Sequence, residues 1–562
     1  MSVLELFARL SPRETAPDGL VDSVAFLEWN HDAETIAAAA DGCGVALAII
    51  GTVIAALAGA FELVLVAIAV GICATVAVRS VPSLLANARR SRALGEAPGV
   101  VSRAVLQTRI APTAEGAAAF AAERDGVLGS SLSRHVRAAN GTPRSGLGRF
   151  AETWRETFPA LHRSVLLVES AAAAPERERD RALDRAMDAV LDGTRDRAAS
   201  AAESIRAPAT ALYAFGVLLP LALVGVLPAA GAAGVDATLI AVVVVYNVLL
   251  PLGLVVASVW LLARRPVAFP PATVPRNHPA VPTRRWPTVV VAVSAAVVGW
   301  VITDIVLVPW MRPLAVIGAG VGVGLVFHYR PIVAFRTRVD SFEESLPDAL
   351  YLVGRRVADG IAVERAVESV TTELDDPARS VFTDAVRRHR QLRIGIEEAF
   401  RGEHGALATY PSRRADSAAG LLGLAAHEGS PAGRALIETA DHLDDLRRVE
   451  RDSRRDLGEV TSTLSNTAAV FGPLVGGATV ALADSVGTTG EIDGSVPATA
   501  ELGVAVGVYV LLLAVVLTIL SVGLSRGLDR PTVGYRVGGA LATATALYLA
   551  AFYAATGVTG GL

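Results

Sequence analysis

Nine runs of apolar residues, separated by short polar turns and by two long polar stretches, dominate the pattern of this 562-residue chain. A helix needs about 20 apolar residues to cross the hydrocarbon core of a bilayer, and each run is close to that length. The pattern therefore predicts an all-α, polytopic membrane protein of about nine transmembrane helices. The predicted spans are 43–60, 62–78, 208–230, 237–263, 287–304, 311–328, 465–483, 501–524 and 537–557.

The two long polar stretches have the periodicity of helices and no strand alternation of useful length. In the second stretch, Ser345 followed by Pro347 predicts a helix start, and Asp359-Gly360 predicts its end. We expect each stretch to form a helical-bundle domain. The predicted organisation is an N-terminal segment (1–42), a membrane hairpin (43–78), a first helical domain (79–207), a membrane pair (208–263), a linker (264–286), a second hairpin (287–328), a second helical domain (329–464) and three membrane helices (465–562).

The chain has no lysine, so its 51 basic residues are all arginine, and these lie almost entirely on one side of the predicted spans. Loops on the cytoplasmic side of a membrane carry an excess of basic residues. The opposite side offers only Arg312, with acids such as Asp236 and Asp484. We therefore expect a multi-pass protein of the cell membrane with a cytoplasmic N-terminus, an extracytoplasmic C-terminus and both polar stretches in the cytoplasm. The orienting arginines are Arg79, Arg89, Arg90, Arg92, Arg264, Arg265, Arg276, Arg284, Arg285, Arg330, Arg336, Arg338, Arg526, Arg530 and Arg536.

The two halves of the chain share landmarks about 256 residues apart. Pro175 falls on Pro431, and each opens a long charged helical stretch. Phe215-Gly216 falls on Phe471-Gly472 at the entry to the following span. Both halves enter and leave the membrane from the same side, so the pattern predicts a parallel internal duplication with its pseudo-twofold axis along the membrane normal. The alternative is that alanine-rich helices match one another by chance.

Composition excludes several classes of function. Apolar residues make up 52% of the chain and the mean hydropathy is +0.47, which favours a surface solvated by lipid. The net charge of −4 gives no overall attraction to nucleic acid. Cys43 and Cys73 both lie in apolar runs, which argues against a disulfide framework. Without lysine, neither a Walker-type phosphate loop nor Schiff-base chemistry is possible, so another subunit would have to hydrolyse ATP.

No motif in the chain predicts an active site. The glycines between 318 and 324 resemble a nucleotide loop by letter, but they lie in an apolar span, where small residues allow close helix packing. The GxSxG match at 523–527 follows a membrane span, whereas a nucleophile elbow follows a strand. The histidines make no metal-ligand spacing. We therefore expect no catalytic residue, no cofactor and no metal, and a protein that is not an enzyme.

The last helix of the second polar stretch segregates its charges along its axis. Acids occupy the first half and arginines the second. Pairs such as Asp444 with Arg448 stand four residues apart, which is typical of a solvated helix laced with ion pairs. The alternative is a docking face for a partner. On that hypothesis the candidate partner-binding residues are Glu364, Glu397, Glu398, Glu438, Asp441, Asp444, Asp445, Arg447, Arg448 and Arg451.

Residues 345–366, which begin Ser-Leu-Pro-Asp-Ala-Leu and contain the turn at Gly360, resemble the F domain of type II secretion systems. The resemblance covers about 341–485 and, more weakly, about 98–225. In the first copy 109–112 stands where the second has 360–363, and the Leu-Pro-Asp-Ala-Leu signature is lost, so the first domain is a degenerate copy. The family consists of platform proteins of type IV pili and related secretion machines.

The resemblance implies a non-enzymatic platform, similar to those of the archaeal branch that serves pili and the archaellum. Its expected partners are a hexameric secretion ATPase, pilin or archaellin subunits, the lipid bilayer and a second copy of the chain, with no nucleic acid. Whether the filament is a pilus, an archaellum or a secretion pseudopilus stays open. Two alternatives from other classes are a secondary transporter with a parallel repeat, and a membrane-anchored sensor.

Overall fold

The computed structural model is mostly helical and contains no strand in the part of the chain that it describes. Nine of the described helices are long and apolar enough to cross a membrane, which confirms the prediction of an all-α chain with nine spans. Most of the predicted linker 264–286 and the first part of the segment 1–42 lie outside the described residues. The described residues are 16–27, 29, 32–57, 62–123, 126–139, 145–232, 238–263, 274, 278, 281–282, 284, 286–428, 430–489 and 498–559.

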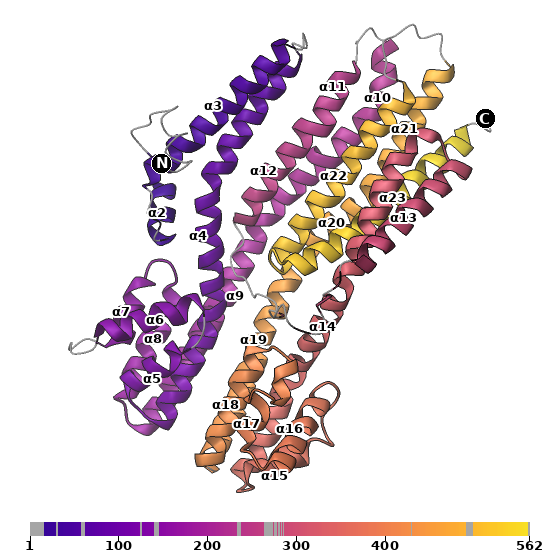
Figure 1. Ribbon diagram of the computed structural model, residues 1–562. Coiled ribbons are helices and arrows are strands. Elements are labelled where there is room, and N and C mark those ends of the chain that lie inside the picture. Colours follow the sequence, from indigo (N-terminus) through magenta and orange to yellow (C-terminus); the bar gives the residue numbers. More distant parts are fainter. Residues whose placement is uncertain are drawn as a thin grey trace.

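The apolar helices stand side by side in the upper part of the molecule (Figure 1). The hairpin of α3 and α4 lies at one edge, preceded by the short α2 (Asp18–Leu27), and α13 packs on α14 near the other. Three of the remaining apolar stretches contain a π-helical segment, marked η. The apolar helices are α3 (Ala33–Leu57), α4 (Glu62–Ile110), α10 (Leu219–Ala232) after η1 (Ala214–Leu218), α11 (Leu239–Val244), η2 (Val245–Leu249) and α12 (Leu250–Ala263), α13 (Trp286–Val306), α14 (Arg312–Ala358), α20 (Gly458–Asn466), η5 (Thr467–Phe471) and α21 (Gly472–Thr489), α22 (Thr499–Ser525) and α23 (Arg530–Thr559).

Two groups of shorter polar helices lie below the apolar helices, and each encloses its own hydrophobic core. The first polar group packs against the lower part of α4 and against α9. The second packs against the lower part of α14 and against α19. Their helices are α5 (Ala114–Ala122), α6 (Val127–Ala139), α7 (Gly146–Thr153), α8 (Pro159–Ala172) and α9 (Glu176–Tyr213), then α15 (Val363–Val370), α16 (Ala378–Leu392), α17 (Ile396–Arg401), α18 (Arg413–Glu428) and α19 (Ser430–Asp456), with a short 3-10 turn η4 (Ala406–Thr409) before α18. A further 3-10 turn, η3 (Pro309–Met311), connects α13 to α14 in the apolar part.

Several helices run without a break from a polar group into the apolar helices. α4, α14 and the continuous stretch of α9, η1 and α10 each do so. The prediction of a helix start at Ser345 is therefore wrong, because α14 passes straight through it and holds Pro347 buried in its interior. The predicted end at Asp359-Gly360 is confirmed: α14 stops at Ala358, and Gly360 has a φ of 89°, which glycine adopts without strain.

α4 and α14 carry prolines at matching places. Pro82 and Pro98 lie inside α4, and Pro331 and Pro347 lie inside α14, each 249 residues further along. Proline in a helix interior removes one backbone hydrogen bond, so two such pairs in one register are unusual. The order of elements around these helices also matches, since each is the second arm of a hairpin and is followed by four short helices and one long one.

Glycines bring α14 into close contact with two neighbours. A Cβ on Gly320 or Gly324 would meet Ala296 or Ala292 of α13, at 3.0 and 2.8 Å. A Cβ on Gly322 would meet the backbone of α23, at 2.8 Å from the Ala542 nitrogen. The prediction that these glycines serve close helix packing is confirmed. Small residues on both faces let backbones approach where lipid supplies no hydrophobic drive between helices.

Two buried tyrosines satisfy backbone carbonyls around the π-helical segment η1. The Tyr509 hydroxyl donates to the Gly216 carbonyl, and the Tyr246 hydroxyl donates to the Pro220 carbonyl at 2.7 Å. Their rings pack edge to face, with centroids 5.6 Å apart. A π-helical turn disturbs the regular i to i−4 pattern, and a carbonyl without a partner is costly in an apolar medium. The two tyrosines therefore stabilise the widened turn.

Candidate partner-binding site

An acid-lined cleft of about 440 Å³ lies between α9 and α19, where the two polar groups meet. Six carboxylates line it, against one guanidinium and one imidazole. Three of the acids, Asp180, Asp184 and Asp188, stand four residues apart and share one face of α9. The lining residues are Arg109, Asp180, Asp184, Met187, Asp188, Leu191, Glu438, Asp441, His442 and Asp445.

α19 contributes to both hydrophobic cores, and this brings its acids to the cleft. Leu436 and Ala440 pack in the core of the second group, whereas Val449 is buried in the core of the first group with Leu446 beside it. The apolar stripe predicted along this helix is thus shared between two different neighbours. Its first turns face the second group and its last turns face the first, which leaves the polar residues between them along the cleft.

Arg109 joins three helices across the cleft. It stands in the last turn of α4, and its guanidinium forms ion pairs with Asp184 of α9 (2.5 Å) and with Glu438 of α19. The Arg109 side chain is only 15% exposed, so water screens these pairs less than pairs on an open surface. Arg109 therefore connects the two polar groups.

Burial in the cleft disfavours the charged forms of two groups on α19. Desolvation raises the pKa of the Glu438 carboxyl, and the Arg109 guanidinium opposes part of that rise. Desolvation also lowers the pKa of the His442 imidazole, with a further contribution from the positive charge of Arg109. His442 is consequently neutral at neutral pH. The negative charge of the cleft is not offset by this residue.

The candidate residues proposed from the sequence do not form one surface. Glu438, Asp441 and Asp445 line the cleft. Asp444 instead forms ion pairs within its own helix, with Arg448 at 2.7 Å and Arg451 at 3.5 Å. These pairs match the interpretation of the charge pattern as a solvated helix laced with ion pairs. Each such pair stabilises a helix by only about 0.2–0.5 kcal/mol.

Arg447 lies close to a partly buried cluster of charges, away from the acids of the cleft. Burial lowers the pKa of Arg447, and the nearby Arg414 lowers it further. Arg414 itself bridges Glu343 of α14 (3.1 Å) and Glu450 of α19 (2.6 Å). This network fastens the end of α19 to α14 and has a structural role.

Glu364, Glu397 and Glu398 lie in the second polar group, on helices that do not line the cleft. Glu364 is in the first turn of α15, and the other two open α17. Glu397 pairs with Arg401 at 2.8 Å, and Arg401 also pairs with Asp416. Glu398 is exposed. These three acids are therefore separate from the set that lines the cleft.

Sequence reasoning missed the part of the site contributed by the first half of the chain. Arg109, Asp180, Asp184 and Asp188 were not among the candidates. The acids at every fourth position of α9 were a readable signal, because such spacing places side chains on one helix face. Nothing local to Arg109 indicated its role, since its partner Glu438 belongs to the other half of the chain.

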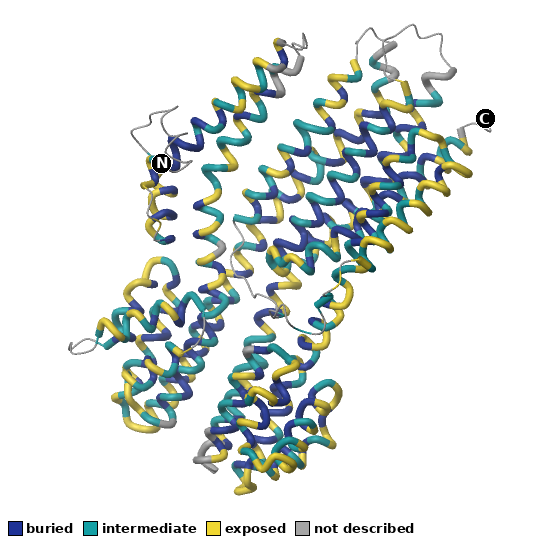
Figure 2. The backbone as a smooth tube through the Cα atoms, viewed as in Figure 1, coloured by how far each residue is buried: buried dark blue, intermediate teal, exposed yellow. Residues whose placement is uncertain are grey.

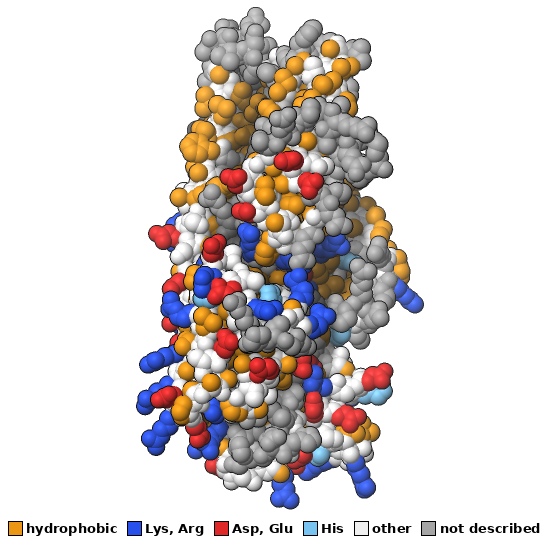
Figure 3. All heavy atoms as spheres, turned by 90° about the vertical axis from the view of Figure 1, so that its left-hand side faces the viewer, with side chains coloured by type: hydrophobic (Ala, Val, Ile, Leu, Met, Phe, Trp, Pro, Cys, Tyr) orange, Lys and Arg blue, Asp and Glu red, His pale blue; other side chains and the backbone are white. Residues whose placement is uncertain are grey.

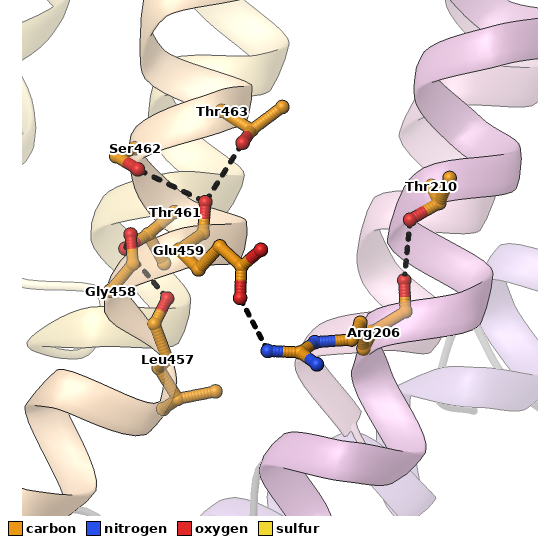
Figure 4. Close-up of polar contacts among 8 residues, drawn as sticks. All are labelled: Arg206, Thr210, Leu457, Gly458, Glu459, Thr461, Ser462 and Thr463. Carbon is orange, nitrogen blue, oxygen red and sulfur yellow. Dashed lines mark hydrogen bonds and ion pairs between the residues drawn. The ribbon is translucent and has the colours of Figure 1, made fainter.

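A second ion pair links the halves closer to the apolar helices. Arg206 of α9 pairs with Glu459 of α20 across the gap between them (Figure 4). Both side chains are well exposed, so this pair contributes little to stability. Beside it, the Thr463 hydroxyl donates to the Glu459 carbonyl and the Thr210 hydroxyl to the Arg206 carbonyl.

The face of the molecule beside α3 and α4 separates apolar from charged surface. Figure 3 shows hydrophobic side chains in its upper part and arginines gathered below. In Figure 2 exposed residues recur along α3 and α4. Exposed apolar side chains on these helices include Ile49, Ile72 and Val76. This distribution is that of a surface partly solvated by lipid.

Comparisons with known proteins add no assignment: no protein-family model, no curated protein and no solved structure matches the chain. The charges that line the cleft indicate which kind of group it can bind. A pocket of six carboxylates with one arginine attracts cationic groups, and its position between two helical groups makes its shape depend on how they are docked.

Proposed function

We propose that the chain is the membrane platform of a type IV pilus-like assembly or secretion machine. Its polar groups lie in the cytoplasm and bind a hexameric secretion ATPase, and its apolar helices handle pilin subunits at the base of the filament. The observation that carries the proposal is the continuity of α4, α14 and α9 with η1 and α10. A force that tilts a polar group is passed along such helices into the membrane without an intervening loop.

The proposal includes an internal duplication of the chain. The matched prolines of α4 and α14 and the repeated order of elements support it. With the two halves aligned 249 residues apart, Pro98 of α4 matches Pro347 of α14. Pro347 is the proline of the Leu-Pro-Asp-Ala-Leu signature, so this proline persists in the first copy although the residues around it differ. Two such units in one chain, or two copies of the chain, suit the centre of a hexameric motor.

The acid-lined cleft is the proposed contact for the ATPase. Basic side chains of the partner would enter between α9 and α19 and meet Asp441, Asp445 and the three acids of α9. Arg109 holds the cleft together through Asp184 and Glu438, so a basic side chain of the partner would compete with it for the Asp184 carboxylate. Binding at this place would therefore loosen or tighten the docking of the two polar groups, which is the motion that the continuous helices transmit.

Reversing the cleft charges tests the proposal. The double substitution Asp441→Arg and Asp445→Arg should lower ATPase co-purification at least tenfold while membrane insertion persists. The matched control is Asp452→Arg with Asp456→Arg, on the same helix and exposed, which should leave co-purification unchanged. Equal co-purification of both variants would sink the ATPase contact.

The runner-up is a secondary transporter, favoured by the three π-helical segments, which are frequent at functional sites. The Gly216 and Pro220 carbonyls near η1 accept hydrogen bonds from Tyr509 and Tyr246, so they are occupied and less available to an ion. A transporter would also leave the two polar groups without a role. Uptake of a labelled solute by vesicles containing only this protein would favour the transporter.

A further inference from the structure

One face of α4 lacks the cover that its counterpart in α14 possesses. The proline register pairs residue 82 with 331, and the hairpin contacts agree with it. A Cβ on Gly71 would meet Ala48 of α3 at 2.7 Å, as one on Gly320 would meet Ala296 of α13 at 3.0 Å. The faces that turn toward the first arm of each hairpin therefore correspond, and so do the faces that turn away.

On α14 the face turned away from α13 is covered by α23. A Cβ on Gly318 would meet Thr545, and one on Gly322 would meet the backbone of α23 at Ala542 and Gly538. In the same way, a Cβ on Gly534 of α23 would meet the ring of Tyr329. Residue numbers rise along α14 as they fall along α23, so the two helices are antiparallel. Further down, Arg336 of α14 pairs with Asp529 and donates to Thr532 at 3.3 Å, which closes the contact.

A Cβ on Gly538 of α23 would also meet Leu325 of α14. The residues of α4 that lie 249 positions before Gly318, Gly322, Leu325 and Tyr329 are Ala69, Cys73, Val76 and Ser80. Beside them Ile72 is 60% exposed and Val76 is 41% exposed. Ile72 and Val76 keep this exposure although α12, η2 and α11 also contact α4, whereas α23 packs along the matching face of α14. The face is continuous with an existing interface, because α4 also packs on α12, η2 and α11, which lie beside it (Figure 1).

We infer that this face of α4 binds one transmembrane helix of a partner subunit, in the place that α23 takes on α14. The occupant is an apolar helix with small residues at every fourth position, antiparallel to α4. This inference rests on the proposed function: in the proposed orientation such a helix has its N-terminus in the cytoplasm and its bulk outside. That is the direction required of a pilin subunit that joins a filament outside the membrane.

The residues of the face favour a helix that can leave again. Gly318 and Gly322 let α23 approach at backbone distance, whereas their counterparts Ala69 and Cys73 carry a Cβ and hold an occupant further away. Close packing of small residues is a principal attraction between helices in lipid, so the α4 contact is the weaker one. Ile72 and Val76 project from the face, which suits a small-residue partner better than a second α4.

Cys73 reports on the site directly. The probe is a synthetic peptide of residues 530–559 with Ala542→Cys, reconstituted in bilayers with the full-length protein carrying Cys43→Ala. Mild oxidation should join the peptide to Cys73. The matched control peptide adds Gly538→Leu and Thr545→Leu and should give at least fivefold less product. A lipid-facing reporter, Ile305→Cys on a Cys43→Ala, Cys73→Ala background, should not distinguish the two peptides.

Equal yields from the two peptides at Cys73 would overturn the inference, because random collision in lipid would explain them. A dominant disulfide between two copies of Cys73 would also overturn it and assign the face to a second copy of the chain. Neither outcome depends on the ATPase contact.

A variant in cells separates this inference from the proposed function. In a host that assembles the filament, Ile72→Trp should block filament assembly while ATPase co-purification stays intact. If the proposed platform function is wrong, the variants of the acid-lined cleft will instead co-purify the ATPase as their control does.

Discussion

At the scale of single residues, Arg109 is the side chain on which the docking of the two polar groups depends most. It sits at the end of one long helix and pairs with acids on two others, so its loss affects the docking of both polar groups. Removing it would leave Glu438 half-buried beside other acids, in surroundings that already raise its pKa. The exposed pair of Arg206 and Glu459 also links the two halves of the chain, between α9 and α20, without the burial, and the pair of Arg109 and Glu438 can be compared with it.

A double-mutant cycle should separate these two links. Arg109→Ala combined with Glu438→Gln is expected to show a coupling of about 0.5–1 kcal/mol, at the upper end of partly exposed pairs. The cycle of Arg206→Ala with Glu459→Gln should give a coupling close to zero. Thermal unfolding in detergent micelles measures both. Equal couplings would contradict the role assigned to Arg109.

His442 should make the protein sensitive to mild acid. Its pKa is lowered in the folded state, so the stability that its neutral form contributes is present above the ordinary pKa of about 6.5 and is lost as the pH falls through the folded value. Unfolding midpoints measured from pH 7.5 to pH 5 should fall less steeply in His442→Gln than in the native protein. His404→Gln, at an exposed position, should leave the slope unchanged. Identical slopes for all three would contradict the assignment.

At the scale of elements, the contact of α14 with α23 depends on glycine backbones. Local sequence was sufficient to predict that small residues in this span serve packing, but not which neighbour each glycine meets. Gly320 and Gly324 turn to α13, whereas Gly318 and Gly322 turn to α23. The same helix therefore holds its hairpin partner and the last helix of the chain on different faces, and the assignment required the tertiary structure.

A pair of neighbouring glycines in α23 tests this contact. Gly538→Ala would place a Cβ 2.7 Å from the Gly322 carbonyl oxygen, whereas Gly539→Ala would meet nothing within 4 Å. We expect Gly538→Ala to destabilise the protein by about 1–3 kcal/mol through overpacking. Gly539→Ala should be neutral or slightly stabilising. Thermal unfolding measures the stability of the two variants. Equal unfolding temperatures would contradict the tight contact between α14 and α23.

At the scale of the whole molecule, the two halves meet through their apolar helices, where α10 packs on α21 and α12 on α22, and through α9 and α19 of the polar groups, where the cleft lies. The placement of the polar groups follows from contacts between residues far apart in the chain. Arg206 and Glu459, for example, are 253 residues apart. Orientation in the membrane is the property of the whole molecule on which the proposed function depends most.

Cysteine labelling should establish this orientation. In a variant with Cys43→Ala and Cys73→Ala, Ile361→Cys in the turn before α15 should react with a membrane-impermeant maleimide only when the cytoplasmic face is accessible. Val308→Cys, between α13 and η3, should react only from outside. Both positions are 42% exposed. Labelling of residue 361 in intact cells would contradict the predicted topology and the platform with it.

Run length and composition by themselves determined the helical class and the nine spans, because a helix satisfies its own backbone and lipid solvates its apolar surface locally. The end of α14 at Gly360 was readable for the same reason. Only the tertiary structure decided that α14 continues through Ser345, that the acids of α19 divide between a cleft and their own helix, and that Arg109 joins them. Each of these depends on partners distant in sequence, and burial against such partners overrides the local signals of a helix start or a solvated face.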